Sequence, residues 1–294
     1  MQGYRNVHPV WGQGLPLEEF LEQRRVSPRH NRADWFVGTL DGQVLTSLAA
    51  YPMEYWLSGV VHQGIAIGSV FTIPECRKRG YARRLLRWVE ENRRAVGATL
   101  SVLYSEIDPQ YYADGGYQLC AAWAGWRQVA DPPPSDGTLK IMQPADHLPR
   151  LHELYDGFHA GRAFAVARSA EYWQFLLVRE PEDRFYFLYG SDQEPLGYVR
   201  AGWSGGVLKI RDFALVADTE DLRSTLLGAI VQEARRLGAE RVGGWLPRSP
   251  ASQAFFDMQE RRESLTMVKP IDPSVEVDMA ALEAAAHFCD ADYV

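Results

Sequence analysis

The sequence predicts an α/β (α+β) protein of two similar units, each a mixed, mostly antiparallel sheet with flanking helices and one splayed pair of parallel strands. The first observation behind this prediction is local. The apolar run at residues 65–73 is followed by a basic turn, an amphipathic stretch and a second apolar run, which is the order of a strand–helix–strand crossover with parallel strands. The second observation is a repeat, because Phe71 and Val102 are 31 positions apart and so are Phe213 and Gly244.

Composition and charge narrow the class of protein. The chain has 294 residues, of which 46% are hydrophobic and 23% charged, and its formal net charge is −7. These values are typical of a globular protein of one large or two ordinary domains. The acidic balance argues against a nucleic-acid partner, which usually meets a basic face. Since no stretch has the length of a membrane span and no secretory leader is recognisable, we expect a cytoplasmic protein that does not bind membranes.

The cysteines and histidines predict neither disulfides nor a metal site. Cys76, Cys120 and Cys289 form no C-x-x-C pair, and their low, odd number does not fit a disulfide framework. The seven histidines show no spacing typical of metal ligands. We therefore expect no bound metal.

The first unit is expected to alternate strands and helices after an irregular stretch at residues 1–12. Asp41-Gly42 is a strong hairpin signal, Pro74 ends the buried strand because it has no N–H for a ladder, and Gly97 ends the amphipathic helix. The expected strands are residues 35–40, 44–51, 53–61, 65–73, 99–105 and 117–126. The expected helices are residues 15–26 and 82–96, with a short one opened by Asp108 and Pro109.

The second unit follows a proline-rich segment. Residues 131–137, DPPPSDG, predict a stiff linker, because consecutive prolines favour an extended chain. The domains are then residues 1–130 and 138–294. The expected helices of the second domain are residues 146–159, 169–178, 222–237 and 250–260, and the strands are 184–190, 196–203, 208–216, 241–246 and 265–271. The tail, residues 279–294, is either a docked or frayed terminus or a segment that reaches the cleft of the first domain.

The basic turn after the central strand suits a polyanionic ligand. A helix N-terminus presents unpaired N–H groups and a partial positive charge. Gly80 and Ala82 let a phosphate approach the backbone, and Arg77, Lys78 and Arg79 add fixed positive charge. Neither a Walker A nor a Rossmann glycine pattern is present. On charge alone, a solvated basic turn on a surface helix remains the simpler alternative.

The full pattern Arg77-x-x-Gly80-x-Ala82 after a buried strand resembles the acyl-CoA pyrophosphate loop of the GNAT (GCN5-related) N-acetyltransferases. Ala82 stands where many members have a second glycine. The resemblance covers residues 15 to about 127 in the order of the elements. It implies that acetyl-CoA binds as a co-substrate at the loop and at the preceding strand. The positions carried over are Val70, Phe71, Thr72, Arg77, Lys78, Arg79, Gly80, Tyr81 and Ala82.

A second segment resembles the family in the region of the leaving thiolate. Tyr111-Tyr112, followed by Gly116-Tyr117, is similar to the family's aromatic-Tyr-x-x-x-Gly-Phe segment. The resemblance implies that Tyr112 protonates the sulfur of CoA. For Tyr111 and Tyr117 we expect packing roles.

Polar residues near the end of the strand at 99–105 complete the candidate catalytic set. Ser105 stands where family members often place a polar residue that faces the cofactor arm. Glu106 and Asp108 follow it, and either carboxylate could relay the amine proton through water. A solvated surface role is an equal alternative for both, and Glu54 is a weaker candidate.

The second domain is expected to be degenerate as a CoA site. Its corresponding turn, residues 217–222, lacks the Arg-x-x-Gly-x-Gly/Ala pattern and carries three acidic residues, which would repel a pyrophosphate. With Tyr172 and Trp173 on an early helix, the tandem is similar to the first two domains of the enhanced-intracellular-survival type acetyltransferases. Mycothiol synthase is also a tandem GNAT protein, but resemblance to it would place the better loop in the second half.

The predicted function is an acetyl-CoA-dependent N-acetyltransferase that acts by direct transfer on a small-molecule or peptide amine. The alternative is a non-catalytic CoA-binding sensor or scaffold that kept the fold and lost turnover. Tyr112 beside an intact loop favours the enzyme. The residues themselves do not specify which amine or which acyl chain is used.

Overall fold

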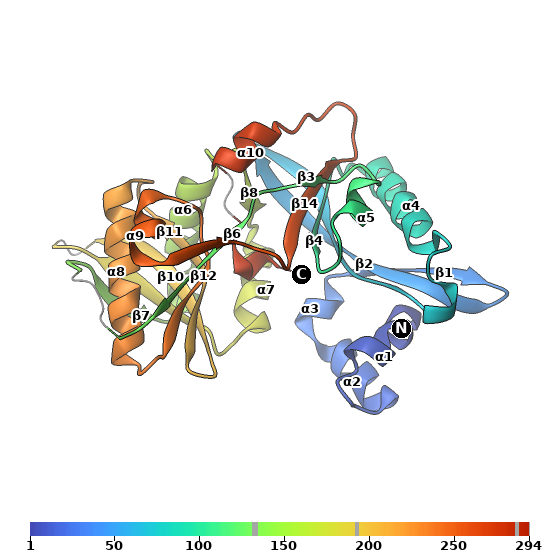
Figure 1. Cartoon of the computed structure of the whole chain (residues 1–294), viewed down its shortest axis with the longest axis horizontal. Coiled ribbons are helices and arrows are strands. Elements are labelled where there is room, and N and C mark those ends of the chain that lie inside the picture. Colours follow the sequence, from blue (N-terminus) through green and yellow to red (C-terminus); the bar gives the residue numbers. More distant parts are fainter. Residues whose placement is uncertain (131–134, 192–193, 286–287, 294) are drawn as a thin grey trace.

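The computed structural model describes residues 1–130, 135–191, 194–285 and 288–293. Within these residues it shows two seven-stranded sheets with helices packed against them (Figure 1). The first sheet has the order β1-β2-β3-β4-β14-β5, with β8 beside β2, and the second has the order β13-β6-β12-β11-β10-β9-β7. Both are mixed and mostly antiparallel, as predicted.

The bounds of the elements are as follows. The strands of the first sheet are β1 (Asp34–Leu40), β2 (Gln43–Leu57), β3 (Val60–Thr72), β4 (Leu100–Ser105), β5 (Gln118–Leu119), β8 (Phe164–Ala167) and β14 (Leu265–Pro270). Those of the second sheet are β6 (Trp123–Gln128), β7 (Thr138–Met142), β9 (Arg184–Tyr189), β10 (Pro195–Ser204), β11 (Val207–Leu215), β12 (Arg241–Trp245) and β13 (Asp257–Glu260). The helices are α1 (Gln2–Trp11), α2 (Leu17–Val26), α3 (Pro28–Asn31), α4 (Tyr81–Ala95), α5 (Gln110–Ala113), α6 (Leu148–His159), α7 (Ala170–Arg179), α8 (Glu220–Arg236), α9 (Pro250–Phe255) and α10 (Met279–Ala285).

Among the described strands, each sheet contains one parallel pair. β3 pairs with β4 only from Gly64 to Ile67, and β11 pairs with β12 only from Val207 to Ile210. Both β3 and β11 continue beyond the pairing, so each pair splays at its end. In the first sheet the splay leaves the β4-facing edge of residues 68–72 without a neighbouring strand.

The two sheets exchange strands, which the sequence did not predict. β6 was expected in the first unit, but it pairs with β12 and β13 of the second sheet. β14 was expected in the second unit, but it lies between β4 and β5 of the first sheet, where it fills the open side of β4 (Figure 1). The domain boundary at the proline-rich linker remains a proposal, because each sheet contains strands from both sides of this linker. Residues 131–134 of that linker lie outside the described part of the chain.

The N-terminal stretch was wrongly expected to be irregular. Residues 2–11 form α1 despite Pro9, whose missing N–H normally costs a helix interior about 3 kcal/mol. Burial offsets this cost, because Tyr4 and Val7 pack with Phe20, Leu21 and Phe71. The side-chain amide of Asn6 also donates to Ser47 Oγ at 2.8 Å. Gly12 ends the helix, and its N–H bonds to the carbonyl of His8.

Two further boundaries differ from prediction for local reasons. The strand expected at 53–61 does not exist as such, because β2 runs on to Leu57 and a turn with Ser58 and Gly59 at positive φ starts β3. The helix expected at 250–260 stops at Phe255, since the following residues extend and pair with β6 as β13. The Asp41-Gly42 hairpin is confirmed, with φ of 48° and 79°.

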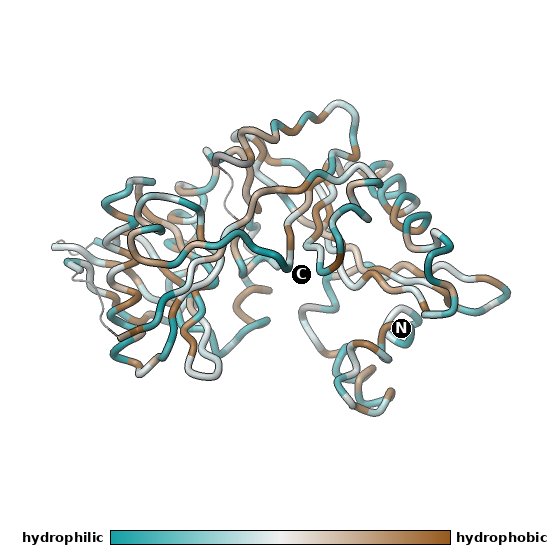
Figure 2. Tube along the Cα trace, in the orientation of Figure 1, coloured by the Kyte–Doolittle hydropathy of each residue, from teal (hydrophilic) through white to brown (hydrophobic). Residues whose placement is uncertain are grey.

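Hydropathy follows this architecture. In Figure 2 the hydrophobic residues concentrate along the central strands, whereas the helix α4 alternates between hydrophobic and hydrophilic turns. No helix within the described ranges is both long and apolar enough to cross a membrane.

Candidate active site

A cavity of about 1030 Å³ opens where β3 and β4 splay. Its walls come from β1, β2, β3, the basic turn, the end of β4, α5, the N-terminal helices and Tyr293 of the tail. The predicted site residues that line it are Val70, Phe71, Thr72, Arg77, Lys78, Gly80, Tyr81, Ala82, Glu106 and Tyr112. Two others, Arg79 and Ser105, do not line it.

The basic turn presents backbone donors to the cavity. Lys78 and Gly80 have positive φ of 61° and 76°, and Gly80 is the N-cap of α4. None of residues 78–83 donates its backbone N–H to a described residue, so successive N–H groups remain for a ligand. A Cβ built on Gly80 meets no atom within 4 Å. A turn of this kind is an anion-binding concavity.

The strand edge beside this turn has fewer free backbone groups than the sequence predicted. Thr46 Oγ1 donates to the carbonyl of Phe71 at 2.9 Å, and Arg77 Nε donates to the carbonyl of Thr72 at 3.1 Å. Ile73 bonds back to β2, and alternation along the strand places Val70 on the opposite edge. Val70 is therefore the best-placed backbone donor and acceptor for an extended ligand.

Tyr112 lies on α5 with its hydroxyl in the protonated state. Its side chain is 8% exposed and packs edge-on against Tyr111 and Tyr117. Burial raises the pKa of Tyr112 to about 12, with Tyr111 adding to the effect. No described residue forms a hydrogen bond with this hydroxyl, so it can donate to a ligand. Gly116, at φ 92°, supplies the left-handed turn that closes the segment.

Ser105 and Glu106 are adjacent in sequence but differ in role. The hydroxyl of Ser105 donates to the carbonyl of Ile107 at 2.9 Å, which closes the turn after β4. Glu106 faces the cavity, and its Oε1 accepts from Ser264 Oγ at 2.6 Å and from Tyr293 Oη at 3.0 Å. Its other oxygen has no partner within the described residues and remains available as a hydrogen-bond acceptor.

The other two candidate carboxylates, those of Asp108 and Glu54, form hydrogen bonds outside the cavity. Asp108 Oδ1 accepts the backbone N–H of Gln110 at 3.0 Å and so opens α5. Glu54 Oε1 accepts from Gln63 Nε2 at 2.6 Å on the surface of β2 and β3. Neither side chain lines the cavity.

The sequence did not predict the aromatic wall of the cavity. It consists of Tyr4, Trp35, Tyr51, Tyr104 and Tyr293. These residues come from α1, β1, β2, β4 and the tail, and no spacing in the chain connects them. Glu106 is the one carboxylate among the described residues that line the cavity. Beside Tyr104 and Tyr293, where this carboxylate lies, the cavity suits a cationic group next to an apolar one, whereas near Tyr4 the lining also includes Arg24 and His30.

The end of the tail, residues 290–293, is held at the cavity by ion pairs and hydrogen bonds, which we call the tail clamp. Arg168, fully buried, donates to both carboxylate oxygens of Asp292 at 3.0 and 2.8 Å. Arg179 donates to the carbonyls of residues 291 and 293 at 2.5 and 3.0 Å. Asp290 accepts from two basic side chains of β11, at 2.7 Å each. Tyr293 is thereby held against Tyr104 of the first sheet, with ring centroids 5.3 Å apart.

The equivalent turn of the second sheet is acidic, and two of its carboxylates are already engaged. Thr219 caps α8, and Asp218 pairs with Arg162 at 2.7 Å and with Arg223. Glu220 Oε2 accepts the backbone N–H of Ala251 at 2.7 Å. Carboxylates in the first turn already complement the helix dipole, and the absence of a pyrophosphate site at this turn stays a prediction.

Comparisons with known proteins agree with the fold. Residues 4–120 match the family model of the acetyltransferase (GNAT) domain. No curated protein matches the sequence. Among solved structures, a probable N-acyltransferase from Enterococcus faecalis is 17% identical with a TM-score of 0.73, over 92% of this chain and 69% of that one.

Two further structures extend the likeness. A GCN5-related N-acetyltransferase from Kribbella flavida is 18% identical with a TM-score of 0.68, over 91% of this chain and 67% of that one. Eis1 from Mycobacterium abscessus is 15% identical with a TM-score of 0.58, over 81% of this chain and 65% of that one. The predicted GNAT-like fold and its likeness to that of an Eis-type protein are confirmed, whereas the division into tandem domains stays a prediction.

Proposed function

We propose, from the GNAT acetyltransferase domain matched at residues 4–120, that the chain is an acetyl-CoA-dependent N-acetyltransferase acting on a small amine. The observation that carries the proposal is the meeting of two features in one cavity. The turn with free backbone donors and the protonated phenol of Tyr112 both line it. The free thiols Cys76, Cys120 and Cys289 fit a reducing compartment, in keeping with a cytoplasmic enzyme.

Acetyl-CoA would bind along one side of the cavity. The N–H groups at residues 78–83 and the side chains of Arg77 and Lys78 suit the pyrophosphate. Val70 suits the pantetheine arm, because its backbone lies on the edge that β4 leaves open. Arg83 also lines the cavity and donates to the carbonyl of Tyr111 at 3.3 Å, so it joins the turn to α5.

The chemistry then needs two proton transfers. The amine nitrogen attacks the thioester carbonyl, a C–N bond forms and the C–S bond breaks. The leaving sulfur takes the proton of Tyr112, whose raised pKa keeps it available at neutral pH. Glu106, directly or through a water, takes the proton that the amine loses. The aromatic wall favours an amine that carries an apolar or aromatic group.

The proposal is tested by thiol release from acetyl-CoA in the presence of an amine panel. The panel contains an arylalkylamine, an aliphatic monoamine, a polyamine and a peptide with a free N-terminus. We expect amine-dependent thiol release, largest for the arylalkylamine. The alternative, a non-catalytic CoA-binding protein, predicts tight acetyl-CoA binding in calorimetry without release for any amine.

The turn assignment predicts a charge effect at Gly80. Gly80→Asp would bring a negative charge against the pyrophosphate, and the open space around this position leaves room for the side chain. We expect acetyl-CoA to bind about 10- to 100-fold more weakly, from Coulomb repulsion at a partly exposed site. Gly80→Asn is the matched control, because asparagine has the same shape, tolerates positive φ and carries no charge. If calorimetry gives the two variants equal affinity for acetyl-CoA, the turn is not the pyrophosphate site.

The acidic turn of the second domain predicts the stoichiometry. A calorimetric titration of the parent protein with acetyl-CoA is expected to saturate at about one equivalent per chain, since like charges at residues 218–221 oppose a second pyrophosphate. Saturation at two equivalents would contradict the assignment of a degenerate second site.

A further inference from the structure

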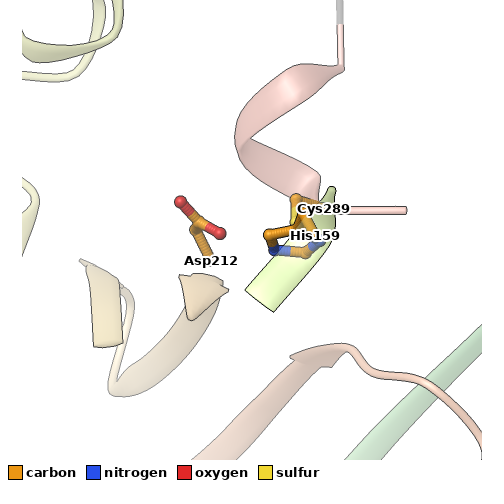
Figure 3. Close-up of side chains that lie close together, drawn as sticks. All are labelled: His159, Asp212 and Cys289. Carbon is orange, nitrogen blue, oxygen red and sulfur yellow. The ribbon is translucent and has the colours of Figure 1, made fainter. Parts of the chain in front are cut away.

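A buried cluster outside the cavity combines three kinds of metal-binding side chain. His159 is the last residue of α6, Asp212 lies in β11 and Cys289 begins the final segment of the tail (Figure 3). Their ligand atoms lie within 4.8 Å of one another. The three residues are 0%, 2% and 3% exposed, respectively. Because they are far apart in the chain, no sequence spacing reveals them.

The donor set is the one that zinc prefers. Imidazole nitrogen, thiolate sulfur and carboxylate oxygen are its usual ligands, at roughly 2.0–2.3 Å, which places neighbouring ligand atoms about 3.4 Å apart in a tetrahedral site. The observed separations need side-chain movements of about an ångström to reach this geometry. Figure 3 shows one carboxylate oxygen of Asp212 directed towards His159 and Cys289.

The carboxylate of Asp212 has one oxygen to spare. Its Oδ2 accepts from Arg168 and from the hydroxyl of Tyr198, the latter at 2.8 Å. Its Oδ1 is buried and has no hydrogen bond of normal geometry within the described part of the chain, where only the thiol of Cys289, a weak donor, contacts this carboxylate. A buried unsatisfied acceptor is unfavourable, and bonds to the second oxygen fix a ligating carboxylate in place.

The charges around the cluster are compatible with a divalent cation. Arg168, Asp212 and Asp292 together carry one negative charge. Binding of Zn²⁺ with loss of the Cys289 thiol proton adds one positive charge and makes the group neutral. The nearby cation of Arg162 is paired with a carboxylate at 2.7 Å, and that of Arg179 lies 3.9 Å from one, so neither adds a full uncompensated charge.

We propose that His159, Asp212 and Cys289 bind one zinc ion, with a water as the fourth ligand. The sulfur–zinc bond forms as the thiol proton leaves to solvent, and no oxidant or reductant is needed. The ion joins α6, β11 and the tail, and so fastens the segment that carries Tyr293 to the cavity wall. The role is structural, because the cluster is buried and separate from the residues of the proposed reaction.

The test measures metal on the full chain, purified without chelator. We expect about one equivalent of zinc per chain by mass spectrometry in the parent protein, either as purified or after incubation with zinc chloride and desalting. Cys289→Ser is expected to retain less than about a tenth of this, because serine is a much poorer zinc ligand. Cys120→Ser is the matched control, since Cys120 is also buried, at 2% exposed, but lies outside the cluster.

Cobalt provides a second readout that does not depend on turnover. After replacement of zinc by Co²⁺, the parent and Cys120→Ser should show a thiolate-to-cobalt charge-transfer band, and Cys289→Ser and His159→Gln should lose or shift it. If Cys289→Ser does not fold, the metal content and the cobalt spectrum of the parent protein still show whether the chain binds the ion through a thiolate. A parent protein that takes up no zinc and gives no thiolate–cobalt band overturns the proposal and leaves a thiol–carboxylate contact only.

Discussion

Tyr112→Phe is expected to lower kcat roughly 10²- to 10⁴-fold, the usual contribution of a positioned general acid. The substitution keeps the ring, which packs against Tyr111 and Tyr117, and removes the hydroxyl alone. Acetyl-CoA affinity should change little, because the turn and the strand edge that would hold the ligand are untouched. The measurement is steady-state thiol release on the best amine of the panel, with calorimetry for acetyl-CoA affinity.

The matched control for this variant is Tyr111→Phe. Tyr111 precedes Tyr112 on α5, lines the same cavity and also has a pKa raised by burial. If kcat depends on the hydroxyl of Tyr112 in particular, and not on any phenol hydroxyl in this wall, Tyr111→Phe should leave kcat near the parent value. Because the pKa of Tyr112 is about 12, its proton stays bound through the neutral and mildly alkaline range. Equal turnover by the parent and Tyr112→Phe would reduce Tyr112 to packing.

The parts of the site that the sequence predicted are local in the chain. Arg77 to Ala82 form one continuous turn, and Gly80 has a φ that other residues rarely adopt. Tyr112 and Gly116 lie on one short segment in the same way. Hence the resemblance of these two short motifs to those of the family was enough to predict both the proposed anion site and the candidate acid, which stay predictions.

The parts that the sequence did not predict depend on contacts between distant segments. β14 is an apolar strand that fits the edge of either sheet by pattern, and only packing beside β4 selects the first. The hydroxyl of Ser105 turned out to bond within its own loop. Glu106 gained partners from residues 264 and 293, which no local signal connects to it. The aromatic wall has the same origin.

The buried arginine of the tail clamp predicts the largest effect on stability. Arg168→Met is expected to lower the free energy of unfolding by about 3–5 kcal/mol, the cost of removing one partner from a buried ion pair. Arg168 bonds two carboxylates, those of Asp212 and Asp292, and all three side chains are at most 2% exposed. Without the guanidinium, both buried carboxylates lose the hydrogen bonds and the positive charge that Arg168 gives them. Urea denaturation monitored by tryptophan fluorescence gives the change.

The comparison is with an exposed pair on the same chain. Arg5 lies 3.5 Å from Glu18, with side chains 51% and 80% exposed, and Arg5→Met should cost less than about 1 kcal/mol. The clamp also predicts a kinetic difference, because Asp292 precedes the residue that contacts Glu106 in the cavity. Arg168→Met should therefore raise the KM for the amine more than the KM for acetyl-CoA. If Arg168→Met is no less stable than Arg5→Met and leaves both KM values unchanged, the tail is not held by this pair and does not shape the acceptor end of the cavity.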